Sequence, residues 1–199
     1  MSGWGHPGHS ARRIPRWGYL AGIALLAIAV AIGLVHKPSR AERAADLTGV
    51  LQTMNADIES CAGGVGESLT ALRLINSGAS HDVTDAITVA GTGASNCSPA
   101  NNELIDDLEG YEVPESLASF HLQLAVTGLI SWAAPDAEQV QSDVARVLAA
   151  GTPQAKAAAQ LALSRGLRRL DAQRAAAEKP IRAAITALAV RGAPPRLPG

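Results

Sequence analysis

The feature that most constrains this chain is an uninterrupted apolar run at residues 17–35, WGYLAGIALLAIAVAIGLV, which contains no charged residue. As a helix rising about 1.5 Å per residue, the run would be roughly 28 Å long, close to the ~30 Å hydrocarbon core of a bilayer. A helix also satisfies its own backbone hydrogen bonds, which a lipid environment requires. The run therefore predicts a transmembrane helix over 17–35.

The flanking residues predict how this helix is oriented. Positive charge before a first span is typical of the cytoplasmic side, and aromatic rings with a polar group favour the headgroup layer. We therefore expect 1–16 to be a disordered cytoplasmic tail and the C-terminal domain to lie outside the cytoplasm. The expected membrane-interface residues are Arg12, Arg13, Arg16, Trp17 and Tyr19.

A cleaved signal peptide is the alternative interpretation of the same run. Ala29-Val30-Ala31 fits a small-x-small cleavage site, and cleavage there would release a secreted helical domain. The apolar residues continue to Val35 with no polar segment before the end of the run, which favours an uncleaved anchor. Both interpretations send the following domain out of the cytoplasm.

The composition predicts an all-α protein. Hydrophobic residues make up 47% of the 199-residue chain but aromatic residues only 3%, so the apolar content is mainly Ala, Leu, Val and Ile. Alanine is the best helix former, and small aliphatic side chains suit closely packed helices better than a β-sandwich. We expect a single helical bundle over 36–191, followed by a flexible tail over 192–199.

A long helix is predicted directly after the hinge that ends at Pro38-Ser39. Apolar residues recur there at alternating spacings of four and three, the pattern of a helix with one buried face. The pattern continues through Gly63, Gly64 and Gly66, which cost about 1 kcal/mol each in a helix, and we expect the helix to stay whole. Its expected inward residues are Leu47, Leu51, Met54, Ile58, Cys61, Val65, Ser68, Leu72 and Ile75.

The rest of the chain predicts two further long helices and shorter ones between them. We expect a short helix over 82–89, a loop over 90–96, and a second short helix capped by Ser98. A longer helix should begin at Pro114, carry Leu117, Phe120 and Leu124 inward and be interrupted at Pro135; the last should begin at Thr152-Pro153. Together these elements predict an up-down bundle of three long helices and short ones, mounted on the membrane helix.

The two cysteines are the most specific local signal. Cys61 belongs to the inner face of the first long helix, and Cys97 precedes the Ser98-Pro99 cap. Two cysteines in a domain outside the cytoplasm favour a disulfide. Their spacing is unlike that of a redox-active CxxC pair, so we expect a structural bond.

The net charge of −1 hides two segments of opposite sign. Residues 74–145 carry acidic residues without Lys or Arg, whereas 146–199 are mainly basic. These segments are expected to face each other in the bundle. The alternative is a basic patch for an anionic partner such as a lipid headgroup or wall polymer, formed by Arg165, Arg168 and Arg169.

No stretch of the sequence predicts catalysis, a cofactor or a metal site. His121 is expected on or beside an apolar face, where a lone histidine is more often structural than catalytic. The acidic run over 103–115 lacks the spacing of a calcium loop, and aromatic residues are too few for stacking on nucleic acid. No nucleophile elbow, P-loop or dinucleotide fingerprint occurs in the sequence.

The functional hypothesis from the sequence is therefore an interaction module. We expect a single-pass envelope protein without enzymatic activity, whose outer bundle binds another envelope protein or an anionic envelope component. The first alternative is a sensor-like bundle that holds a small molecule near Gly63-Gly64 and His121. A hydrolase with an unrecognised site is a more distant alternative.

Overall fold

The computed structural model describes residues 37–98, 100 and 103–198, and in this part of the chain all regular structure is helical. The predicted cytoplasmic tail, the predicted transmembrane helix at 17–35 and the expected membrane-interface residues lie outside the described residues. Among the residues that are described, no helix is both long enough and apolar enough to cross a bilayer. The all-α prediction is confirmed for the described chain.

Helix α2 (Arg40–Ser77) is the long first helix predicted from the 4-3 spacing. Ser39 and Glu42 form a reciprocal capping box at its start, and Gly78 ends it in the left-handed conformation with φ of 73°. Eight of the nine predicted inward residues are buried, and Ile75 is half-buried. The glycines at 63, 64 and 66 do not interrupt the helix, as expected.

Helix α3 (Val83–Cys97) corrects the prediction of a short helix over 82–89 followed by a loop over 90–96. Propensity alone disfavours a helix through Gly91 and Gly93. The helix persists because Ala86, Ala90, Gly93 and Cys97, spaced four, three and four apart, are buried on its inner face. Ser98 follows the end of α3 as its C-cap, and the short helix expected to begin at Ser98-Pro99 lies partly outside the described residues.

The segment after α3 is built from short helices: α4 (Glu103–Glu109), the 3₁₀ helix η2 (Glu115–Phe120) and α5 (Leu122–Ser131). The single longer helix expected from Pro114 is divided at His121, which has a positive φ of 55°. This break shifts the helical register, so Leu122, Ala125, Val126 and Leu129 face the core. Leu124, predicted to face inward, is 69% exposed.

Helices α6 and α7 complete the bundle. The π-helical turn η3 (Trp132–Ala137) joins α5 to α6 (Glu138–Ala149), with non-helical backbone at Ala134 before Pro135, so the predicted interruption is confirmed. Helix α7 (Pro153–Leu188) begins with Thr152 as N-cap and Pro153 in its first turn, as predicted.

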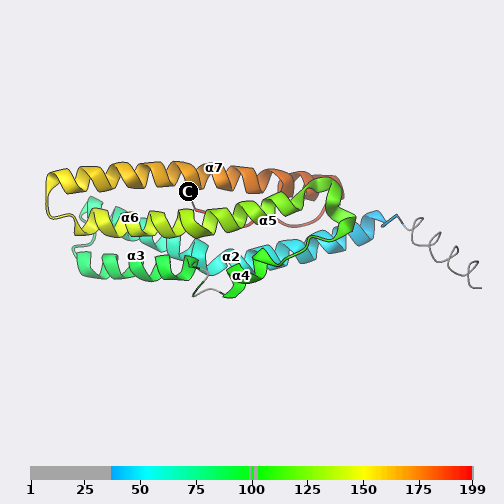
Figure 1. Ribbon diagram of the computed structural model, residues 1–199, viewed down its shortest axis with the longest axis horizontal. Helices are drawn as coiled ribbons and strands as arrows, with labels where there is room; N and C mark the ends of the chain where they lie inside the picture. Colours follow the sequence, from blue (N-terminus) through cyan, green and yellow to red (C-terminus); the bar gives the residue numbers. More distant parts are fainter. Residues whose placement is uncertain (1–36, 99, 101–102, 199) are drawn as a thin grey trace, which may run out of the picture. The chain divides into compact units, whose positions relative to one another are not determined.

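These helices form an elongated bundle (Figure 1). Helix α2, the α5–η3–α6 arm and α7 run along its length, while α3 packs on α2 and α6 at one end. Helices α4 and η2 also pack against α2. One apolar core extends through the bundle, with Met54, Leu129, Trp132 and Ile181 among its fully buried residues.

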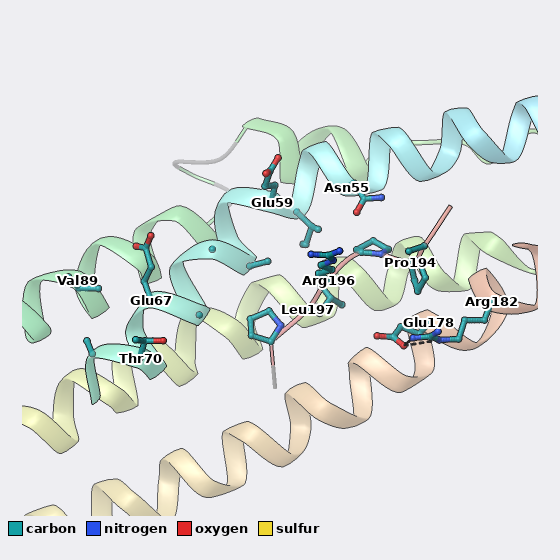
Figure 2. A pocket seen from close by; sticks show the side chains of 18 of the residues that line it. Asn55, Glu59, Glu67, Thr70, Val89, Glu178, Arg182, Pro194, Arg196 and Leu197 are labelled. Carbon is teal, nitrogen blue, oxygen red and sulfur yellow. Dashed lines mark hydrogen bonds and ion pairs between the residues drawn. The ribbon is translucent and has the colours of Figure 1, made fainter. Parts of the chain in front are cut away.

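The end of the chain differs from the predicted flexible tail over 192–199. After α7 the chain turns at Ala189, with φ of 56°, and 190–198 return along the bundle between α2 and α7 (Figures 1 and 2). Pro194, Pro195 and Leu197 are buried, and Arg174 Nη1 donates to the Leu197 carbonyl oxygen at 3.4 Å. Burial of these apolar side chains offsets the entropy cost of ordering the segment.

Candidate functional site

An open groove of about 1420 Å³ lies beside the second half of α2 (Figure 2). One wall is the face of α2 from Asn55 to Leu74, and Val89 of α3 extends it. The other side is formed by the tail, 193–198, and by Glu178 and Arg182 of α7. The groove therefore depends on the return of the chain's end to α2.

The floor of the groove is made of small side chains. Ala62, Gly63, Gly66 and Ala71 line it, and a Cβ added at either glycine would meet no atom within 4 Å. Leu74, at the far end, is 42% exposed. The open space at these two glycines leaves room for another molecule to approach the α2 backbone.

Charged residues stand on the borders of the groove. Glu59 and Glu67 of α2 are exposed, whereas Glu178 is engaged by Arg182 of the same helix, with Oε2 2.6 Å from Nη2. Arg196 is the charged residue that the tail contributes. On the α2 side the border is therefore acidic.

Gly64 has a different role from the nearby Gly63 and Gly66 of α2. A Cβ on Gly64 would lie 2.8 Å from Gly93 Cα of α3, and a Cβ on Gly93 would lie 1.9 Å from Gln141 Oε1. Helices α2 and α3 can approach this closely only because both positions lack a side chain. The glycine turn thus faces the groove at 63 and 66 and the packed interior at 64.

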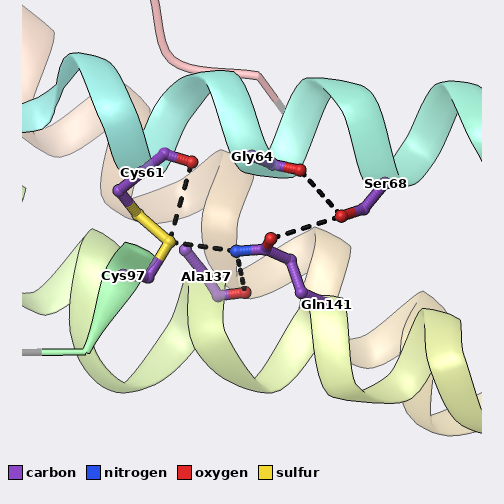
Figure 3. The surroundings of a disulfide bond; sticks show 6 residues. All are labelled: Cys61, Gly64, Ser68, Cys97, Ala137 and Gln141. Carbon is purple, nitrogen blue, oxygen red and sulfur yellow. Dashed lines mark hydrogen bonds between the residues drawn. A yellow bond between two sulfur atoms is a disulfide. The ribbon is translucent and has the colours of Figure 1, made fainter. Parts of the chain in front are cut away.

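The predicted disulfide between Cys61 and Cys97 is confirmed, with Cα atoms 4.6 Å apart (Figure 3). The Gln141 side chain lies beside it, its Nε2 2.9 Å from Cys97 Sγ and 3.4 Å from the Ala137 carbonyl oxygen. Ser68 Oγ lies 2.7 Å from the Gly64 carbonyl oxygen and 3.2 Å from Gln141 Oε1. Every heteroatom of this fully buried cluster has a partner, so the cluster joins α2, α3 and α6 without an unpaired polar group.

The sequence did not indicate Gln141. It is fully buried although glutamine usually lies at the surface. Gln141 follows Ala137 by four residues and Val140 by one, and it lies on the inward face of α6. This spacing from buried apolar residues is the sequence signal that could have predicted its burial.

The three arginines of the predicted basic patch are all exposed on α7, and one of them is paired. Arg169 Nε lies 2.9 Å from Asp136 Oδ1, an ion pair between α7 and η3. Arg165 and Arg168 are exposed. One acidic and one basic segment therefore do meet at Arg169, and an anionic partner for the patch stays a prediction.

Two titratable residues, His121 and Asp57, do not line the groove. His121 is exposed at the turn between η2 and α5, which corrects its expected place on an apolar face. Asp57 of α2 is only 5% exposed, and its Oδ2 has no hydrogen-bond partner. Burial, and secondarily the charge of Asp107, raise the pKa of the Asp57 carboxyl above its usual 3.8.

Within the described chain, no three His, Cys, Asp or Glu side chains converge as a metal site would require. Comparison of the chain with protein-family models, with curated proteins and with solved structures finds no match.

Proposed function

We propose that this chain is a single-pass envelope protein whose extracytoplasmic helical domain is an interaction module, with the groove beside α2 as its binding surface. The apolar run at 17–35 supports the anchor. The disulfide supports an oxidising compartment for the domain, since such bonds persist mainly outside the cytosol.

The shape of the groove is the observation that carries the proposal. Small-molecule sites are typically enclosed clefts of about 300–1,000 Å³ that bury most of the ligand. This groove is larger, at about 1420 Å³, and follows α2 from Asn55 to Leu74, a helical rise of about 28 Å. An open channel of that length suits a segment of polypeptide better than a compact ligand.

The chemistry of the lining also favours binding over catalysis. The described residues that line the groove offer carboxylates, arginines, one amide and the hydroxyl of Thr70. A nucleophilic mechanism would need a hydroxyl or thiol paired with a base that is itself oriented by a third group. The Thr70 side chain is exposed, and none of the hydrogen bonds described for the groove joins it to such a base.

The small-molecule alternative has weaker support. It placed a ligand between the Gly63-Gly64 turn and His121. Gly63 does line the groove, but Gly64 packs against α3 and His121 lies at the η2–α5 turn. The structure does not bring these residues to one site.

The membrane anchor is tested separately from the binding surface. We expect the protein to stay in the pellet after carbonate washing of membranes, because a spanning helix is held by the bilayer and not by surface charge. Protease added to cells with a permeabilised outer layer should remove the domain and leave a short membrane fragment. Release by carbonate would exclude the anchor, and full protection from protease would reverse the proposed topology.

The binding surface is tested by site-specific photo-crosslinking in intact membranes. A photoreactive residue at Thr70, in the groove, should give a discrete adduct with one envelope protein. The matched control is the same residue at Ala175, which is exposed on α7 and does not line the groove. Adducts of the same pattern from both positions, or none from Thr70, would contradict the proposal.

A further inference from the structure

We infer that the groove beside α2 receives an extended polypeptide segment that carries proline, leucine and arginine, bound beyond Leu197 of the chain's own tail. This inference rests on the proposed function and specifies its partner. The inference follows from three observations: the proline-rich tail that packs in the neighbouring part of the groove, the small residues that line the unoccupied part, and the acidic residues on its border.

The tail shows which chemistry this channel accepts. Residues 193–198 read APPRLP, and they lie extended between α2 and α7 with Pro194, Pro195 and Leu197 buried (Figure 2). Proline has no backbone N–H, so a proline-rich segment can be buried on helices while leaving fewer unsatisfied donors. Its restricted φ also lowers the entropy lost when the segment is held extended.

The groove continues beyond Leu197 of the tail. In Figure 2, Asn55 lies beside the tail, whereas Glu67, Thr70 and Val89 lie beyond Leu197 along the same channel. The floor there includes Gly66, where an added Cβ would meet no atom within 4 Å. Leu74 leaves 42% of its surface uncovered at this end. The empty stretch thus continues the surface on which the tail packs.

The negative charge along the border of the unoccupied part of the groove favours a basic segment as its occupant. Glu59 and Glu67 are exposed on the α2 side, and Glu178, the acid on the α7 side, is already paired with Arg182. An arginine in the occupant would meet free carboxylates on α2, as a charge-complementary partner requires. An anionic lipid or wall polymer would meet the same carboxylates and be repelled.

The test uses the full-length protein in detergent and a fluorescein-labelled peptide, RGAPPRLPG, which repeats residues 191–199. We expect saturable binding by fluorescence anisotropy. A peptide with serine in place of every proline should bind about tenfold more weakly or worse. The variant Glu67→Gln should weaken binding at low salt and much less at high salt, because the contact is a surface ion pair.

Filling the groove provides the decisive variant. Gly66→Leu should reduce affinity about tenfold or more, while its higher helix propensity preserves the fold. Gly49→Leu is the matched control: Gly49 is also a helical glycine of α2 with open space beyond its Cα, but it does not line the groove. Melting curves of both variants should show no loss of stability, and Gly49→Leu should bind as the wild type does.

The position of the bound peptide is read by crosslinking from Thr70 and from Asn55. Attachment at Thr70 supports the inference, whereas attachment at Asn55 alone would mean that the peptide only displaces the tail. No saturable binding below about 1 mM, equal binding of the serine peptide, or no effect of Gly66→Leu would each overturn it. A persistent Thr70 adduct in membranes without peptide binding would overturn this partner class and leave the proposed function intact.

Discussion

Adding one methyl group at Gly63 should stabilise the domain, whereas the same change at Gly64 should leave its stability unchanged or lower it. The two residues are neighbours in the same turn of α2, so alanine should improve helix propensity equally at both. Their surroundings differ. A Cβ at Gly63 meets no atom within 4 Å, whereas a Cβ at Gly64 lies 2.8 Å from Gly93 Cα and 3.2 Å from Gly93 O.

The magnitudes follow from these distances. Glycine costs about 0.8–1.0 kcal/mol relative to alanine in a helix interior, so Gly63→Ala should stabilise by up to about 1 kcal/mol. Carbon atoms pack best at about 3.5–4.0 Å, so Gly64→Ala must displace the α3 backbone. Overpacking of this kind costs about 1–3 kcal/mol, and Gly64→Ala should therefore be neutral or destabilising by up to about 2 kcal/mol.

The assay is thermal unfolding of the full-length protein in detergent, followed by far-ultraviolet circular dichroism. For a domain of this size, about 1 kcal/mol corresponds to about 2–4 °C in Tm. Gly63→Ala should thus melt higher than the wild type and Gly64→Ala at the same temperature or lower. Equal shifts in the two variants would refute the close α2–α3 contact that the reasoning depends on.

Three further predictions concern buried charge, surface charge and the disulfide. Because burial raises the pKa of Asp57 above 3.8 in the folded state, the carboxyl destabilises the fold as pH rises from 3.8 to the folded-state pKa. Asp57→Asn should therefore raise Tm at pH 7 and much less below pH 3.8, unlike the exposed control Asp106→Asn. A gain in Tm that does not depend on pH would contradict this prediction. Arg169→Gln should lower stability by up to about 1 kcal/mol at low salt and less at high salt, with Arg168→Gln as an unpaired control that should leave Tm unchanged. Reducing the disulfide should cost up to about 4 kcal/mol and accelerate amide hydrogen exchange in α3 before α7; uniform acceleration would refute a local role.

Much of the fold could be predicted from local patterns. The 4-3 spacing of apolar residues in α2 was sufficient because it outweighed the glycine penalty over many turns. Thr152-Pro153 marked the start of α7 correctly, since capping depends on adjacent residues only. The disulfide was predictable because two cysteines in a domain expected to lie outside the cytoplasm leave a single pairing.

The errors arose where a contact distant in sequence decided the local structure. Residues 90–96 are helical because Gly93 lies against Gly64 of α2, which no local propensity indicates. The register of α5 shifted because one residue, His121, adopts the left-handed conformation.

The candidate site shows the same division between sequence and tertiary structure. The glycine-rich turn of α2, the cysteine beside it and the proline-rich segment at 193–198 are all apparent in the sequence. The return of this segment to α2, where it borders a groove, could not be predicted from the sequence, because burying Pro194, Pro195 and Leu197 requires a surface formed jointly by α2 and α7, which 75 residues separate along the chain. The tertiary structure also places Gly63 and Gly66 toward open space and Gly64 against α3. Sequence alone could not distinguish them, since the role of a residue without a side chain depends on what lies opposite it.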